Sequence, residues 1–272
     1  MNPTLPQWIT DLDQSARHDV IPAGDVAIHW RSWGEGEPLI LLHGGSGSWM
    51  HWARNIGPLS ERYRVIVPDL PAFGDSDSFE TTSLDEYAAL LVPGIRALTD
   101  GPVRMAGFSF GSVIGLALFA HGINGPDYVM LGSPVLGRVH PVTDQLQKWR
   151  GLPDPADRLE AHRNNVAVLM IHEPDKVTDE AALIQMSHAE RARGRYRGIF
   201  HGIDVVAYLS QRAGKLSVIY GDHDALCWRH LPERQSLVEK LEGAAEFTLL
   251  PDVGHWVPYE AADEVNRRLL AL

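Results

Sequence analysis

Short apolar runs alternate along the chain with stretches in which apolar residues recur every three or four positions. The first pattern predicts buried strands, and the second predicts helices packed on them. We expect strands at Val26 to Trp30, Leu39 to Leu42, Arg64 to Val67, Val103 to Ala106, Tyr128 to Leu131, Leu216 to Tyr220 and Ala245 to Leu250. Such alternation is typical of a mostly parallel sheet covered by helices on both faces. The predicted fold class is therefore α/β.

The stretch between Pro134 and Leu216 has a different pattern, with no convincing strand. We expect helices there at Thr143 to Trp149, Ala156 to Ile171 and Thr178 to Arg193. Proline and glycine separate these segments, as in short helices joined by turns. The pattern predicts a core made of residues 1–134 and 214–272, and a helical cap made of residues 135–213 that roofs one edge of the sheet.

A serine stands between two glycines in Gly107-Phe108-Ser109-Phe110-Gly111, directly after a predicted strand and before an apolar helix. A tight strand-to-helix turn of this kind holds the serine in a strained conformation and exposes its hydroxyl group. Small flanking residues let the strand and the helix approach each other closely. The first N–H groups of the helix carry partial positive charge toward any anion that forms there. Ser109 is therefore a candidate nucleophile.

A serine hydroxyl needs a base within hydrogen-bond reach, and a third group must orient that base. Asp222 and Asp224 follow the predicted strand that ends at Tyr220, and His255 follows the last predicted strand. Ligands bind outside the carboxyl ends of the strands in open α/β sheets. We therefore expect Ser109, His255 and one of the two aspartates to lie together.

Several separated motifs give the chain its resemblance to the α/β-hydrolase fold superfamily, in its lidded form. They are His43-Gly44-Gly45, the segment from Pro68 to Ser76, the turn around Ser109, the Gly221 to Asp224 turn and Gly254-His255-Trp256. The order serine, acid, histidine is also the order in that fold. The resemblance implies a mostly parallel eight-stranded sheet flanked by helices, with a helical lid inserted after the sixth strand.

The resemblance also implies roles for single residues. Ser109 is similar to the nucleophile, and His255 is similar to the general base. Asp224 occupies the usual position of the family's acid, so Asp222 is expected to form the turn. No cofactor and no metal ion is implied, because a serine hydrolase of this kind needs neither.

The oxyanion hole is expected from the backbone N–H groups of Gly45 and Phe110. In this motif His43 usually packs beneath the loop and hydrogen-bonds to the backbone, so we do not expect it to act as a base.

A partial similarity to carbon–carbon bond hydrolases, the meta-cleavage product hydrolases, rests on the segment from His43 to Asn55 and on Trp256. Together with the aromatic residues around Ser109, it points to an apolar substrate pocket. The substrate-binding residues that we expect are Phe108, His51, Trp256 and Trp49.

The predicted reaction is hydrolysis of a small carboxylic ester, thioester or lactone through an acyl-serine intermediate. Two alternatives stay open. The first is C–C bond hydrolysis of a vinylogous diketone formed by ring fission, and the second is a slow-turnover ligand receptor on the same fold.

Composition narrows the range of partners. The formal net charge of −11 argues against nucleic acid, whose binding requires clustered Lys and Arg. No apolar run approaches the roughly 20 residues that cross a bilayer, and the first residues lack the pattern of a secretory signal. Cys227 is the single cysteine, so no intramolecular disulfide can form. We expect a cytoplasmic monomer or homodimer that binds a small apolar molecule, with no membrane partner.

Overall fold

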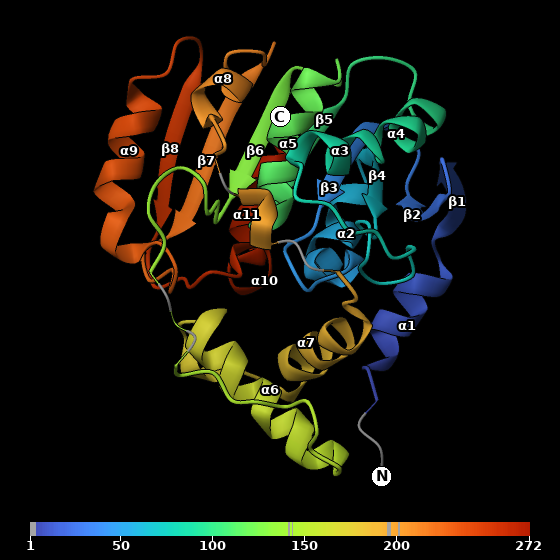
Figure 1. The fold of residues 1–272 in the computed structure, drawn as a ribbon, viewed down its shortest axis with the longest axis vertical. Helices are drawn as coiled ribbons and strands as arrows, with labels where there is room; N and C mark the ends of the chain where they lie inside the picture. The colour runs from blue at the N-terminus through green and yellow to red at the C-terminus, as the bar shows by residue number, and fades with distance from the viewer. Residues whose placement is uncertain (1–3, 141, 143, 195–196, 201) are drawn as a thin grey trace.

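The computed structural model describes residues 4–140, 142, 144–194, 197–200 and 202–272. Within this part of the chain, an eight-stranded sheet lies between two layers of helices (Figure 1). Its strands are β1 (Arg17–Ala23), β2 (Val26–Trp33), β3 (Glu37–Leu42), β4 (Tyr63–Pro68), β5 (Arg104–Phe108), β6 (Asp127–Leu131), β7 (Lys215–Gly221) and β8 (Ala245–Leu250). The predicted sheet and fold class are confirmed.

The spatial order of the strands is β1-β2-β4-β3-β5-β6-β7-β8. β1 and β4 each pair with β2 in antiparallel fashion, and all other neighbours are parallel. Sequence analysis missed β1, which starts with polar residues and contains Pro22. A strand at the edge of a sheet tolerates proline and polar residues because it pairs on one side only. Its sequence therefore lacks the apolar run of a central strand.

Helices cover both faces of the sheet, and two further helices lie beyond its edge. The described helices are α1 (Gln7–Gln14), α2 (Ala53–Ser60), α3 (Leu84–Ala89), α4 (Val92–Leu98), α5 (Phe110–Ala120), α6 (Pro155–Leu169), α7 (Asp179–Arg191), α8 (Val205–Leu209), α9 (Leu231–Glu239), α10 (Val257–Glu260) and α11 (Ala262–Leu270). Short 3-10 helices lie at Trp49–Trp52, Pro174–Lys176, Arg197–Phe200 and Trp228–His230.

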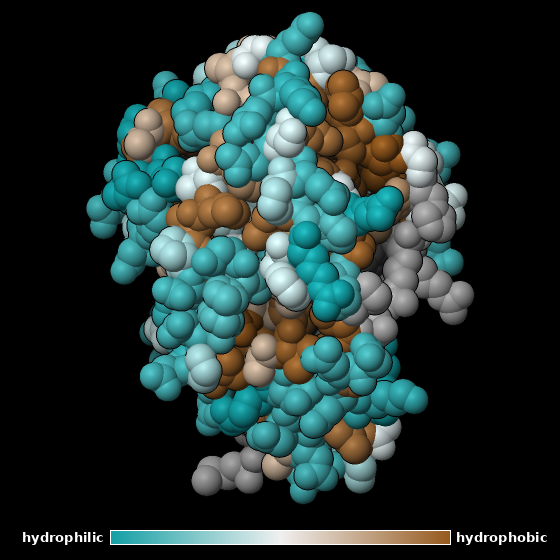
Figure 2. Space-filling model, turned by 90° about the vertical axis from the view of Figure 1, so that its left-hand side faces the viewer, coloured by the Kyte–Doolittle hydropathy of each residue, from teal (hydrophilic) through white to brown (hydrophobic). Residues whose placement is uncertain are grey.

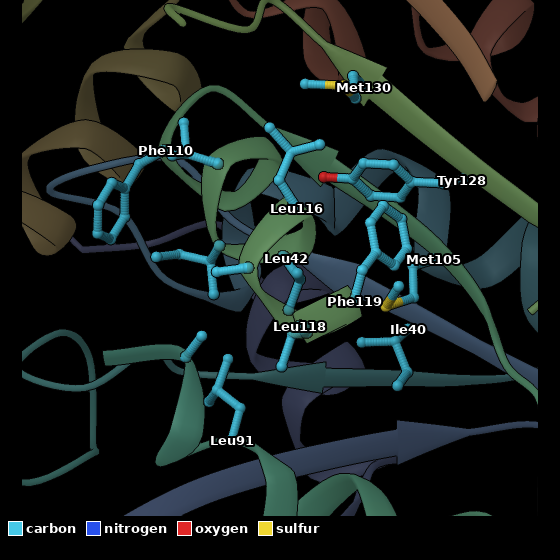
Figure 3. Packing of buried hydrophobic residues seen from close by; sticks show 14 of the residues in the cluster. Ile40, Leu42, Leu91, Met105, Phe110, Leu116, Leu118, Phe119, Tyr128 and Met130 are labelled. Atoms are coloured by element: carbon cyan, nitrogen blue, oxygen red, sulfur yellow. The ribbon is translucent and has the colours of Figure 1, made fainter. Parts of the chain in front are cut away.

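The side-chain alternation of the central strands feeds two separate cores. Ile40 and Leu42 of β3 pack with residues from α3, α4, α5, α8 and α9, whereas Leu39 and Leu41 pack with residues from α1, α2 and α11. Figure 3 shows the first core, where Phe119 of α5 faces Tyr128 of β6. Because both faces are buried, the central strands read as continuous apolar runs.

Two helices, α6 and α7, follow β6 in the chain and lie beyond the carboxyl ends of the strands (Figure 1). Asp154 caps the start of α6 and Thr178 caps the start of α7, each through a side-chain oxygen that accepts a backbone N–H. α8, in contrast, packs on α5 of the body although it lies within residues 135–213. The division of the chain into core and cap stays a prediction.

The helix predicted at Thr143 to Trp149 is not present in the described part of this segment, so that prediction was wrong. Thr143 lies outside the described residues, and residues 144–149 form a turn and an irregular segment. The Asn165 side chain accepts a hydrogen bond from the Gln147 backbone N–H at 2.7 Å and donates one to the Gln147 carbonyl oxygen at 3.0 Å. This tertiary pairing satisfies backbone groups that a local helix would otherwise use.

None of the described helices is long and apolar enough to span a bilayer.

Candidate active site

Ser109 sits at the sharp turn between β5 and α5, with φ 48° and ψ −115°. This left-handed φ is strained for a residue with a side chain. A Cβ atom at Gly107 would lie 2.6 Å from the Gly111 carbonyl oxygen, and one at Gly111 would lie 2.2 Å from the Leu42 carbonyl oxygen. Only glycine fits at both positions, so the two glycines permit the close approach that the turn requires.

A continuous chain of hydrogen bonds joins three side chains from three loops. Ser109 Oγ lies 3.0 Å from His255 Nε2, and His255 Nδ1 lies 2.8 Å from Asp224 Oδ2. Ser109 is partly exposed, whereas Asp224 is fully buried and His255 is 3% exposed. The arrangement has the geometry of a serine nucleophile, a base and an orienting acid.

Of the two aspartates in the loop after β7, Asp224 contacts His255 and Asp222 does not. The second carboxylate oxygen of Asp224 accepts the N–H groups of Leu226 and Cys227, at 2.9 and 3.1 Å, so the carboxylate is fixed in the loop. Asp222 is half-exposed and faces the Val253 N–H at 3.5 Å. The structure thus places Asp224 against His255 and Asp222 in the turn.

Two residues that sequence reasoning missed support the His255 loop. A Cβ at Gly132, where φ is 56°, would lie 3.2 Å from the His255 ring, so glycine leaves room for the imidazole. The buried carboxylate of Glu260 accepts the Gly254 N–H at 2.6 Å and the N–H groups of His172 and Glu173 at 2.9 and 2.8 Å. Nothing in the local sequence marks either residue for this task.

The loop after β3 runs along the same site. The Leu70 N–H donates to His43 Nε2 at 2.9 Å, so the proton lies on Nδ1, which donates to the Gly44 carbonyl oxygen at 2.8 Å. Burial lowers the pKa of His43, which keeps the imidazole neutral. His43 therefore holds the loop, and Gly45 of this loop and Phe110 both line the cavity that contains Ser109.

A cavity of about 540 Å³ opens beside Ser109 and His255. Its wall comes from the loop after β3, the start of α5, the segment after β6 and the end of α6, and it includes the aliphatic side chains of Val135, Val142, Leu146, Leu169, Ile203 and Leu226. Figure 2 shows apolar surface in the hollow between the body and the lower part of the molecule, which contains α6 and α7 (Figure 1). Phe108, His51 and Met170 also line this cavity.

A larger depression, of about 1010 Å³, lies between α1 and the C-terminal helices and is lined by residues such as Trp8, Arg54 and Asp263. It contains none of the three hydrogen-bonded side chains. The candidate site is therefore the smaller cavity, which Ser109 and His255 line.

The structure corrects the expected positions of Trp49 and Trp256, neither of which belongs to the described lining of the cavity. The Trp49 ring packs against Trp33 at 5.7 Å between centroids. Trp256 is fully buried, and its Nε1 donates to the His51 carbonyl oxygen at 3.1 Å. Trp256 therefore lies behind His51, and it supports the wall of the cavity without forming its surface.

His51 reaches the cavity in an unusual setting. Its Nδ1 accepts the Gly44 N–H at 3.1 Å, and its buried Nε2 has no partner within the described residues. The centroid of its ring lies 4.5 Å from that of His188, a buried residue of α7 that sequence analysis did not single out.

Burial, and then the neighbouring His188, hold the pKa of His51 well below its usual range. Burial lowers the pKa of His188 in the same way. Both rings are therefore neutral near pH 7.

Comparison with known proteins places the chain in a family. A sequence profile of the alpha/beta hydrolase family matches residues 39–268, a span that includes all three hydrogen-bonded side chains. The chain belongs to this family. It is 28% identical over 268 residues to a 2-hydroxy-6-oxo-6-phenylhexa-2,4-dienoate hydrolase from Comamonas testosteroni, covering 89% of this chain and 90% of the relative.

Solved structures of α/β hydrolases share the fold. A carboxylesterase from Bacillus subtilis superposes with a TM-score of 0.79 at 18% identity, covering 97% of this chain and 96% of the esterase. A meta-cleavage product hydrolase from Pseudomonas fluorescens superposes with a TM-score of 0.70 at 23% identity, covering 93% and 96%. At these identities the likeness establishes the fold and leaves the substrate open.

Proposed function

We propose that the chain is a serine hydrolase that cleaves a small carboxylic ester, thioester or lactone through an acyl-serine intermediate. The observation that carries the proposal is the hydrogen-bond chain from Asp224 through His255 to Ser109, which ends at the wall of an apolar cavity. Cavities of this size and lining are typical of small-molecule sites.

In the acylation half-reaction, Ser109 Oγ attacks the carbonyl carbon of the substrate while its proton passes to His255 Nε2. Asp224 holds the other ring nitrogen and stabilises the imidazolium that forms. The backbone N–H groups of Gly45 and Phe110 stabilise the oxyanion. His255 then donates the proton to the leaving oxygen or sulfur atom as its bond to the carbonyl carbon breaks.

In the deacylation half-reaction, a water molecule gives a proton to His255 and attacks the acyl-serine. The ester bond to Ser109 Oγ breaks, the proton returns from the imidazole to the serine, and the carboxylic acid is released. The base and acid roles of His255 thus alternate, as general acid–base catalysis requires.

The charge of the cavity favours a neutral substrate. No Lys or Arg lines it within the described part of the chain. Arg191 and Arg193 of the cap segment are engaged elsewhere, with the Asp75 carboxylate and the Ser76 carbonyl oxygen. A buried carboxylate on the substrate would have no cationic partner there, which is costly in an apolar site.

C–C bond hydrolysis is the second candidate. Its support is the full-length similarity to a 2-hydroxy-6-oxo-6-phenylhexa-2,4-dienoate hydrolase and the Gly254-His255-Trp256 segment. In that reaction Ser109 and His255 would assist ketonisation of the dienol before the C–C bond is cleaved.

A panel of p-nitrophenyl esters of increasing acyl length, measured beside 2-hydroxy-6-oxo-6-phenylhexa-2,4-dienoate, separates the two candidates. We expect short esters to be hydrolysed with a higher kcat/KM than the dienoate, and the Ser109→Ala variant to hydrolyse neither. A preference for the dienoate would favour C–C hydrolysis. Turnover of neither substrate would leave the slow-turnover receptor as the better interpretation.

A further inference from the structure

A group of three metal-ligating side chains lies outside the candidate active site. His172 belongs to the segment that joins α6 to α7, His223 belongs to the loop after β7, and Asp252 follows β8. One ligand atom from each residue lies within 4.8 Å of the others, and all three residues are exposed. The rings of His172 and His223 are stacked at 3.6 Å between centroids, with 1° between their planes. Segments far apart in the sequence thus bring two imidazoles and a carboxylate together.

The backbone beneath these side chains is fixed by hydrogen bonds. The His172 N–H donates to the buried Glu260 carboxylate at 2.9 Å, and the His223 N–H donates to the Val253 carbonyl oxygen at 3.0 Å. Asp252 sits in a turn with a φ of 57°. The Cα positions of His172 and His223 are therefore set by hydrogen bonds that need no ligand.

The donor atoms suit a divalent transition-metal ion. Imidazole nitrogen and carboxylate oxygen are common ligands of Zn²⁺, with bonds of about 2.0–2.2 Å, which places tetrahedral ligand atoms roughly 3.4 Å apart. Rotation of the exposed side chains of His172, His223 and Asp252, a motion of picoseconds to nanoseconds, converges donors that now lie within 4.8 Å. Three protein ligands leave a fourth position for water.

We propose that His172, His223 and Asp252 bind a divalent transition-metal ion of the Zn²⁺ type. The bound ion links the segment after α6 to two loops of the body. His223 directly precedes Asp224, and Asp252 lies three residues before His255 in the sequence. The ion therefore connects the cap segment to the loops that carry the acid and the base. This site takes no part in the proposed hydrolysis, and the test of metal binding does not depend on the proposed function.

Calorimetric titration of the full, tag-free chain with ZnCl₂ tests the site. We expect one saturable site per chain. Its affinity should fall about tenfold or more in His172→Ala and in His223→Ala, because loss of a ligand costs more than loss of an outer-shell partner, which typically costs 10–100-fold. The matched control is His18→Ala, which removes an exposed histidine far from the group in sequence and should leave the affinity unchanged.

Thermal unfolding provides a second readout, because an ion that binds only the folded chain raises Tm. ZnCl₂ should raise Tm of the wild type and of His18→Ala, and it should raise Tm less in Asp252→Asn. MgCl₂, which prefers oxygen ligands, should have no such effect. Absence of saturable Zn²⁺ binding, or wild-type affinity in the His172→Ala/His223→Ala double variant, would overturn the proposal.

Discussion

The imidazole of His255 links a buried carboxylate to a partly exposed hydroxyl. Its Nδ1 faces Asp224, which is fixed by two backbone N–H groups, so Nε2 is left to face Ser109. The tautomer that can accept the serine proton is therefore set by the loop after β7. The carboxylate that contacts His255 is that of Asp224 and not that of Asp222, so we propose that Asp224 orients the base.

Asp224→Asn should lower kcat for ester hydrolysis by about 10⁴-fold, because an amide at this position favours the wrong histidine tautomer. Asp222→Asn is the matched control. It changes a carboxylate two residues away that does not contact His255, and it should retain kcat within a fewfold. Steady-state kinetics on one short ester would measure both. Equal losses in the two variants would contradict the assignment of the acid.

Residue types in the right order were enough to predict Ser109, His255 and one of two aspartates as the members of the hydrogen-bond chain. The choice of Asp224 over Asp222 came from the family resemblance, because both follow the same strand. The directions of Trp49 and Trp256 could not be predicted. Trp49 starts a short 3-10 helix and Trp256 is the irregular residue before α10, so neither belongs to a long periodic element. Tertiary packing against Trp33 and His51 decides where the two rings point.

At the level of elements, the turn between β5 and α5 depends on the absence of side chains where strand and helix meet. Gly111 lies directly above the backbone of β3, with carbonyl oxygens of Leu42 and His43 within 2.6 Å of a hypothetical Cβ. These atoms belong to backbone and cannot rotate away. A side chain at position 111 would therefore collide with this backbone.

Gly111→Val should destabilise the fold by at least about 3 kcal/mol, since overpacking against rigid backbone forces larger shifts than ordinary overpacking. Gly57→Ala, in α2, is the control, because no atom lies within 4 Å of a Cβ there. Removing a helical glycine should raise stability by up to about 1 kcal/mol. Urea unfolding would compare the two. A Gly111→Val protein as stable as the wild type would refute this geometry.

Elements with a strong apolar pattern could be predicted, and elements decided by their neighbours could not. β8 has the predicted bounds, and α6 and α7 differ from the prediction by a few residues at their ends. β1 escaped prediction because an edge strand needs few apolar residues. Residues 144–149 do not form the predicted helix because the Asn165 side chain, eighteen residues further along the chain from Gln147, binds the Gln147 backbone.

On the scale of the whole molecule, folding buries several histidines in neutral form. Burial lowers the pKa of His43, His51 and His188, and it lowers the pKa of His162 to about 4. Below about pH 6.5 the unfolded chain binds protons at these imidazoles, whereas the folded chain does not. The free energy of unfolding therefore decreases as the pH falls from about 6.5 toward 4.

Tm should consequently fall steeply between about pH 6.5 and pH 5, because each neutral buried imidazole contributes up to about 1.4 kcal/mol per pH unit. His188→Gln removes one of these groups and should make the slope of Tm against pH shallower. His18→Gln, at an exposed position, should leave the slope unchanged. Calorimetry across this pH range would measure all three proteins. A slope that is flat in the wild type would contradict the neutral state of the buried imidazoles.

Labelling with a fluorophosphonate, read by intact mass, tests the proposed nucleophile most directly. The reagent modifies only a serine hydroxyl activated by a base and placed beside an oxyanion hole. We expect the wild type to gain the mass of one phosphonyl group and Ser109→Ala, correctly folded, to gain none. An unlabelled wild type, or equal labelling of the two proteins, would contradict the assignment of Ser109 as the activated nucleophile.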